Sequence, residues 1–132
     1  MVEAKPQARL DLKPEHVKFV KDAMVGVNKE GTGARAFAGA PYVSAGKTGT
    51  AQVIAIKQGE KYIASRVAEQ HRDHALFIAY APADAPKIAL AVVVENAGFG
   101  AQSAAPVARK VIDYYLLGKE PAAPQGERAA RP

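Results

Sequence analysis

The chain has 132 residues, and 48% of them are hydrophobic, which is enough apolar material for the core of one globular domain. Its formal net charge of +5 comes from basic residues spread along the sequence without a basic stripe interleaved with aromatics, which argues against nucleic acid as a partner. The absence of cysteine excludes disulfide bonds, thiol catalysis and cysteine-based zinc sites.

The N-terminal part of the chain predicts an irregular lead followed by a helix. Residues 1–13 show no hydrophobic periodicity. Pro14 suits the first turn of a helix, where its missing N–H has no intrahelical partner to lose. Apolar residues between Val17 and Val27 then repeat at helical spacing, so we predict a helix over residues 14–28.

Three segments have the composition of strands. Residues 43–56 alternate loosely and include β-branched side chains. Residues 74–82 and 87–96 are nearly continuous apolar runs, and the turn-forming sequence ADAP at 83–86 joins them. A continuous apolar run is typical of a covered strand, so we predict an antiparallel hairpin that is buried on both faces. Residues 57–73 are polar and form a long connection.

The C-terminal part predicts a second helix over residues 104–117, with Pro106 in its first turn and Gly118 as its stop. Its expected apolar side is formed by Val107, Val111, Ile112, Tyr115 and Leu116. Residues 118–132 are rich in Pro, Ala and charge, and we expect a disordered tail. The order helix, three antiparallel strands, helix predicts an α+β fold with an antiparallel sheet flanked by helices.

The segment Gly46-Lys47-Thr48 matches the end of a phosphate-binding P-loop, but its context contradicts a nucleotide site. A P-loop has another glycine five residues before the Gly-Lys pair, and a helix follows the lysine. The first glycine is replaced here by Pro41, and the residues after Thr48 continue as a strand.

The overlapping triplet Lys47-Thr48-Gly49 resembles the third motif of penicillin-recognising serine enzymes, which lies on a strand beside the active site in those enzymes. On a strand, Thr48 and Thr50 point to the same face, so both hydroxyls can hydrogen-bond one substrate carboxylate. In the setting of that motif, Lys47 would supply positive charge for the carboxylate, and Gly49 would leave room for substrate to approach the backbone.

On a wider set of residues, the chain resembles the C-terminal part of the transpeptidase domain of class B penicillin-binding proteins. It is most similar to their elongation-specific subfamily, the penicillin-binding proteins 2, and the resemblance covers roughly residues 14–117. The segments that carry it are AGKTGTAQV (45–53), EKY (60–62), HRDHALFIAYAP (71–82), VVVENAG (92–98) and PVARKVIDYYL (106–116).

The resemblance implies the C-terminal portion of the penicillin-binding protein transpeptidase and serine β-lactamase-like fold. The parent enzyme would be a peptidoglycan D,D-transpeptidase that cross-links stem peptides, is acylated by β-lactams and uses no cofactor. It would be anchored in the bacterial inner membrane with this domain in the periplasm, and would work with a glycan polymerase. We expect the chain itself to be soluble, because its sequence shows no targeting signal.

The resemblance also implies a role for each motif residue. Lys47 would support catalysis by its charge and by organising the serine of a Ser-x-Asn motif. Thr48 and Thr50 would bind the terminal carboxylate of the stem peptide or of a β-lactam, and Gly49 would lie against the substrate. The backbone N–H of Thr50 would be one of two oxyanion-hole donors.

The family's two other motifs are missing, and so is the nucleophilic serine. The literal match Ser44-Ala45-Gly46-Lys47 to Ser-x-x-Lys is expected to be a decoy, because three residues along a strand place two side chains on opposite faces. We therefore predict that this chain alone is inactive. Alternatives are a D,D-carboxypeptidase or serine β-lactamase of the same superfamily, and a non-catalytic peptide-binding module.

Two further expectations concern ligands and partners. His71 and His74 flank Arg72 and Asp73 in a pattern that fits the entry to a strand, and no metal site is expected there. The strand at 87–96 would be central in the parent, so in this chain its outer edge should pair with the upstream half of the domain, a second copy or residues 1–13.

Overall fold

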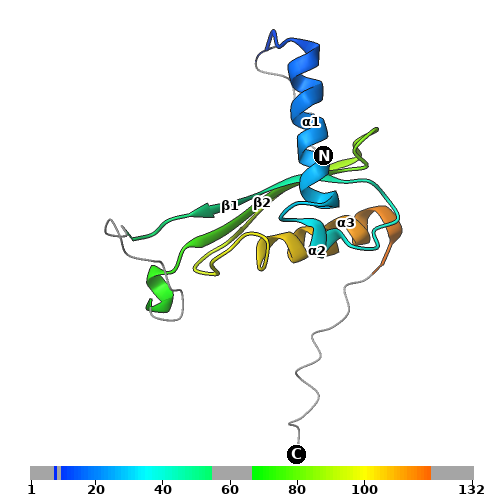
Figure 1. Ribbon diagram of the computed structural model, residues 1–132. Helices are drawn as coiled ribbons and strands as arrows, with labels where there is room; N and C mark the ends of the chain where they lie inside the picture. The colour runs from blue at the N-terminus through cyan, green and yellow to red at the C-terminus, as the bar shows by residue number, and fades with distance from the viewer. Residues whose placement is uncertain (1–7, 9, 55–66, 120–132) are drawn as a thin grey trace, which may run out of the picture.

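The computed structural model describes residues 8, 10–54 and 67–119 (Figure 1). The elements are α1 (Pro14–Lys29), α2 (Ala34–Phe37), β1 (Ala45–Ala51), the short 3-10 helix η2 (Glu69–His71), β2 (His74–Ala81), β3 (Ile88–Val94) and α3 (Ala104–Leu117). The predicted α+β fold with an antiparallel sheet and flanking helices is confirmed. The predicted tail beyond residue 119, most of the lead and the EKY segment lie outside the described residues.

The three strands form one sheet in the order β1-β2-β3, with every pair antiparallel. Thr48 pairs with Phe77, and Phe77 in turn pairs with Val92. Residues directly opposite one another share a face of the sheet, so this row lies on a single face. Within the described part of the chain, β1 and β3 are both edge strands.

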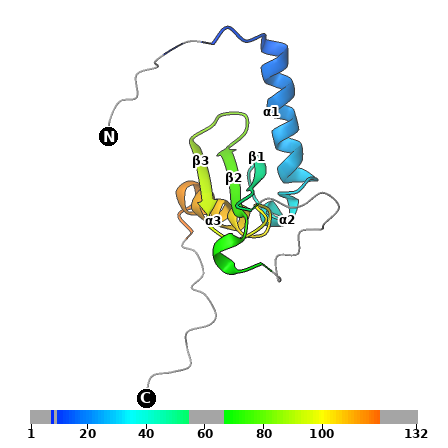
Figure 2. The ribbon, with the colours of Figure 1, turned by 90° about the vertical axis from the view of Figure 1, so that its left-hand side faces the viewer.

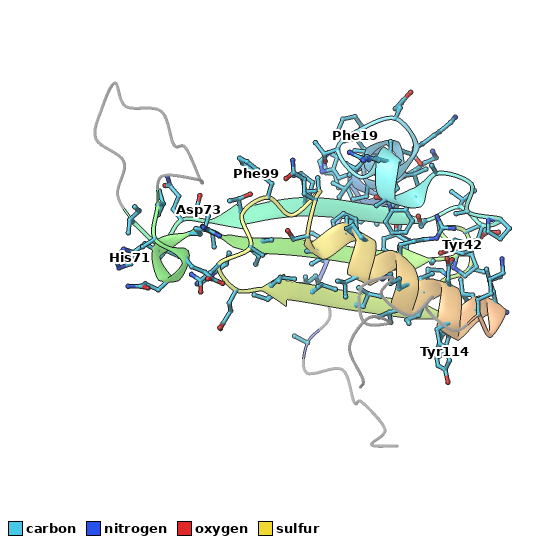
Figure 3. All side chains as sticks on the ribbon, turned by 90° about the horizontal axis from the view of Figure 1, so that it is seen from below. Phe19, Tyr42, His71, Asp73, Phe99 and Tyr114 are labelled. Atoms are coloured by element: carbon cyan, nitrogen blue, oxygen red, sulfur yellow. The ribbon has the colours of Figure 1, made fainter. Side chains whose placement is uncertain are left out.

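The core lies on the face of the sheet that α3 covers (Figure 3). Phe77 of β2 and Ile112 of α3 are its largest fully buried side chains. Phe37 of α2 stacks on Phe77, with ring centroids 5.8 Å apart and an interplanar angle of 24°. The buried side chains of β2 therefore form one side of the core, and those of α2 and α3 form the other side.

The expected burial of the hairpin on both faces is wrong for this chain. Ile78 of β2 is 49% exposed and Val93 of β3 is 60% exposed. Both lie on the face opposite to α3, and no described element covers them. The predicted strand bounds also shorten: of the strand expected over 43–56, the described residues 43–54 form a strand only over β1, and of the strand expected over 87–96 only β3 is formed.

The predicted apolar side of the second helix is correct for Ile112 and Leu116 and wrong for Val107, Val111 and Tyr115, which are exposed. The residues that face the sheet instead are Ala104, Ala105 and Ala108, each fully buried. Small side chains at this spacing let the helix backbone approach the sheet closely, so the alanines and not the valines form the contact surface.

Helix α1 stands beside β1 and extends beyond the sheet (Figures 1 and 2). Only its C-terminal part packs on β1, and Phe19 is 75% exposed. An open groove of about 1100 Å³ lies between α1 and the β2–β3 turn, with Val17, Val25, Tyr80 and Pro82 among its lining.

Candidate functional site

The Lys-Thr-Gly triplet lies on β1, the strand that the sequence predicted for it. β1 pairs with β2 along its whole length, and no described strand pairs with its other edge. Lys47 is exposed, and its Nζ donates a hydrogen bond of 2.8 Å to the carbonyl oxygen of Thr48. The triplet thus lies on an open edge strand, with a cation above its backbone.

Thr48 and Thr50 lie on the same face of β1, opposite Phe77 and Ala75 respectively. Thr50 is exposed and Thr48 is half-buried. The Oγ1 atom of Thr48 lies 3.0 Å from Oγ1 of Thr32, which belongs to the turn after α1. The sequence predicted the shared face but gave no signal for the contact with Thr32, because 16 residues separate the two threonines.

The strand is closely packed at its beginning. A Cβ at Gly46 would come within 2.7 Å of Phe77 Cζ and 2.9 Å of the Ile78 carbonyl oxygen. At Gly49 the nearest atom to such a Cβ is Leu76 Cβ at 3.3 Å, so that position is less crowded. Gly46 is therefore required by the packing of β1 on the core.

The loop between β3 and α3 passes directly over β1. A Cβ at Gly100 would overlap the carbonyl oxygen of Leu76 and would lie 2.7 Å from the carbonyl oxygen of Gly49. The neighbouring Phe99 is 52% exposed, and Figure 3 shows it on the side of β1. Gly100 thus allows the loop backbone to touch the strand that carries the motif, a contact that sequence reasoning missed.

Ser44, the serine of the literal Ser-x-x-Lys match, is buried just before β1 begins. Its Oγ accepts a hydrogen bond of 2.9 Å from Nδ2 of Asn28 at the end of α1. Lys47 is exposed and bonds elsewhere. The two residues that the match would pair therefore have different surroundings, and Ser44 ties α1 to β1.

The HRDH sequence at the start of β2 is engaged in bonds that hold strand ends together. Val53 N–H donates to Asp73 Oδ1 over 3.3 Å, and Asn96 N–H donates to His74 Nδ1 over 2.9 Å. The side-chain amide of Asn96 donates to the carbonyl oxygen of Arg72. No group of three possible ligands for a metal ion occurs among the residues that the structure describes.

A second polar cluster fixes the loop before β1 to α3. Tyr42 donates its hydroxyl proton to Asp113 over 2.6 Å, and Arg109 Nε donates to both carboxylate oxygens of Asp113. Arg109 also donates to the carbonyl oxygens of Ala36 and Ala38. Burial and the hydrogen bond to Asp113 raise the pKa of Tyr42 far above its ordinary value. The cluster therefore holds a neutral phenol next to a charged pair.

Comparison with known proteins identifies the family of this chain. The family model of the penicillin binding protein transpeptidase domain matches residues 1–113. The chain belongs to this family. The peptidoglycan D,D-transpeptidase MrdA of Haemophilus influenzae is 54% identical over 91 residues, which are 69% of this chain and 14% of that protein. The curated relatives called MrdA are matched over only 14–17% of their length.

Solved structures of penicillin-binding proteins show the same fold. Pseudomonas aeruginosa PBP2 in complex with WCK 5153 has a TM-score of 0.70 at 38% identity, over 92% of this chain and 25% of that one. Helicobacter pylori PBP2 in complex with MreC has a TM-score of 0.61 at 27% identity, over 79% and 18%. The imipenem acyl-enzyme of penicillin-binding protein A from Mycobacterium tuberculosis has a TM-score of 0.60 at 33% identity, over 88% and 22%.

These comparisons confirm the predicted family and fold class, and the match to PBP2 relatives confirms the predicted subfamily. The penicillin-binding fold therefore includes this antiparallel sheet with its helices. Within the described ranges, no helix combines the length and apolar character that crossing a bilayer requires.

Proposed function

We propose that this chain is the part of a peptidoglycan D,D-transpeptidase that carries the substrate-binding strand. The observation that carries the proposal is the sequence Lys47-Thr48-Gly49-Thr50 on an open edge strand, in a chain that belongs to the transpeptidase family. An open edge leaves backbone groups for an extended peptide, which binds by adding itself to a sheet.

Each motif residue takes a role that its surroundings support. The exposed side chain of Thr50 and the half-buried hydroxyl of Thr48 would receive the terminal carboxylate of a stem peptide or of a β-lactam, and the exposed Lys47 would add positive charge. Lys47 would also organise the serine of a Ser-x-Asn motif in the parent. Gly49 would lie against the substrate backbone.

The backbone N–H of Thr50 would be an oxyanion-hole donor. The carbonyl oxygen of Thr48 accepts a hydrogen bond from the exposed side chain of Lys47. This bond supports the view that the backbone groups of Thr48 point to the open edge of β1. Alternate residues of an antiparallel strand direct their backbone groups to the same edge, so Thr50 N–H is expected beside it. A donor of this kind stabilises the transition state by about 3 to 4 kcal/mol in other enzymes.

The chemistry follows the family pattern and needs residues beyond this chain. A serine of the parent would attack the carbonyl carbon of the penultimate D-Ala, and terminal D-Ala would leave with a proton. The amine of a neighbouring stem peptide would then take the acyl group and release the serine. A β-lactam would form an ester with the same serine as its ring opens; the mycobacterial relative has been solved as an imipenem acyl-enzyme.

Ser44 is not the nucleophile in this proposal, and the chain alone is inactive. Its hydroxyl is buried against Asn28, and Lys47, the lysine of the Ser-x-x-Lys match, bonds to the carbonyl oxygen of Thr48 instead. A nucleophilic serine needs a base within hydrogen-bond reach.

The parent would lie in the inner membrane with this domain in the periplasm, and the upstream part of the same domain would complete the site. A glycan polymerase would supply the glycan strands whose stem peptides the parent transpeptidase cross-links. The Helicobacter pylori relative has been solved in complex with MreC, so an MreC protein is a further proposed partner.

The test uses the full-length parent and the second-order rate constant of acylation by a fluorescent penicillin. Lys47→Ala and Thr50→Val should each slow acylation at least tenfold, while thermal stability stays within about 1 kcal/mol because both side chains are exposed.

Lys87→Ala is the matched control, since Lys87 is exposed just before β3 and belongs to no motif. It should leave acylation unchanged. Unchanged acylation in Lys47→Ala and Thr50→Val would contradict the proposed roles, and a large loss of stability with normal acylation would assign the motif a structural role.

A further inference from the structure

Thr32, which no motif includes, contacts the proposed substrate-binding strand directly. Its Oγ1 lies 3.0 Å from Oγ1 of Thr48. Thr32 is in the turn formed by residues 31–33, between α1 and α2. We propose that Thr32 is a positioning residue that orients the hydroxyl of Thr48 toward the substrate carboxylate; this inference rests on the proposed function.

The turn around Thr32 is fixed on both sides by close packing. Gly31 N–H donates to the carbonyl of Gly26 and Gly33 N–H to that of Val27, each over 2.9 Å. A Cβ at Gly31 would lie 2.9 Å from Val27 Cα, so only glycine fits there. Thr32 is therefore held in place by the last turn of α1.

The same end of α1 is fixed to β1. Asn28 Nδ2 donates to Ser44 Oγ in a buried hydrogen bond of 2.9 Å. Asn28 Oδ1 faces β1, since a Cβ at Gly46 would lie 3.0 Å from it. The turn and the strand are thus packed together, and buried contacts of neighbouring residues set the distance between Thr32 and Thr48.

The direction of the hydrogen bond follows from the number of protons. A threonine hydroxyl has one proton to donate and two lone pairs that accept. If Thr48 donates its proton to a substrate carboxylate, it can only accept from Thr32. Thr32 must then be the donor, and its proton occupies a lone pair of Thr48 and directs the remaining O–H away from the turn. The pair is a two-step chain of donors that ends on the carboxylate.

The experiment measures acylation of the full-length parent by a penicillin in two backgrounds, wild type and Thr48→Val. In the wild-type background, Thr32→Val should lower the second-order rate constant by about three- to tenfold, as expected for the loss of one neutral hydrogen bond. Thr32→Ser keeps the donor and should stay within about twofold of wild type. In the Thr48→Val background, Thr32→Val should have no further effect.

Separate measurement of the saturation constant and the limiting acylation rate distinguishes a positioning role of Thr32 from a purely structural one. The carboxylate contact exists before the reaction as well as during it, so the loss should fall on the saturation constant and leave the limiting acylation rate nearly unchanged. A penicillin methyl ester, which lacks the carboxylate charge, should show a smaller effect of Thr32→Val than the free acid.

Three results would overturn the inference: no effect of Thr32→Val, an equal effect in both backgrounds, or a loss in Thr32→Ser as large as in Thr32→Val. Failure of the proposed function looks different, because Thr48→Val and Thr50→Val would then themselves leave acylation unchanged. Circular dichroism of each variant verifies that the fold is intact.

Discussion

The two threonines of β1 have different surroundings, although they lie on the same face. Thr50 is exposed, so its hydroxyl can turn toward a ligand. Thr48 is half-buried, and its hydroxyl is already within hydrogen-bond distance of Thr32. The hydroxyl of Thr50 is therefore free to reorient and that of Thr48 is preoriented, a combination that fits the proposed binding of a carboxylate.

Asp113 is the residue whose charge holds the loop before β1, and it predicts a dependence of stability on pH. Burial alone would raise the pKa of Asp113, but hydrogen bonds from Tyr42 and Arg109 and the charge of Arg109 lower it below its ordinary value of 3.8. A depressed pKa in the folded state means that the charged form stabilises the fold. This contribution is complete above pH about 3.8 and is lost as the pH falls through the lower native pKa.

Asp113→Asn should therefore lower the free energy of unfolding at pH 7 by about 2 kcal/mol and flatten its decline in acid. Urea unfolding of the chain between pH 2 and 7 measures both. Asp22→Asn is the control, because Asp22 forms an exposed pair with Lys18 and its loss should cost less than about 1 kcal/mol. An acid limb that keeps its slope in Asp113→Asn would contradict the assignment.

The structure confirms the expected types of element and corrects their burial. Hydrophobic patterns are local, so the sequence predicted β2, β3, α1 and α3 with small errors at their ends, and β1 with bounds that were too wide. Burial depends on what packs against an element. Val111 and Ile112 are neighbours with similar side chains, yet one is 43% exposed and the other fully buried. Only the position of the sheet relative to α3 distinguishes them.

The candidate site likewise has a part that could be predicted from the sequence and a part that depends on tertiary packing. The motif Lys47-Thr48-Gly49 could be predicted because a short run of letters and a strand pattern coincide. Asn28, Thr32 and Gly100 reach the same strand from other elements. Nothing near them in the sequence indicates that contact, because it is created by the turn after α1 and by the loop before α3.

We expect the isolated chain to self-associate through the outer edge of β3. Among the described residues no strand pairs with it, and its side chains include the exposed Val93. Such an edge is a template for another strand. In the parent we expect the upstream half of the domain to cover it. The purified chain should therefore sediment as a dimer or larger species at low micromolar concentration.

Val93→Lys places a charge beside this edge and should shift the chain toward the monomer. Val20→Lys introduces the same charge on α1, where Val20 is 55% exposed, and should leave the association intact. A wild-type chain that sediments as a monomer, with rapidly exchanging amides along β3, would show that the edge is tolerated bare and that the expectation is wrong.

The molecule as a whole presents a covered side and open sides. On the covered side α2 and α3 close the core, and the polar cluster around Asp113 locks the loop that leads into β1. The other sheet face, the groove beside α1 and both sheet edges are open in the described part of the chain. This distribution fits a proposed parent whose remaining residues cover the open sides and bring a nucleophile to β1.

Covalent labelling by a fluorescent penicillin tests this account most directly, with the isolated chain and the full-length parent compared side by side. The account predicts a labelled band for the parent and none for the chain, since the proposed site on β1 would bind a carboxylate but Ser44, the serine of the Ser-x-x-Lys match, is buried and bonded to Asn28. Labelling of the isolated chain that disappears in Ser44→Ala would contradict it, because residues 44–47 would then be a working nucleophile and base.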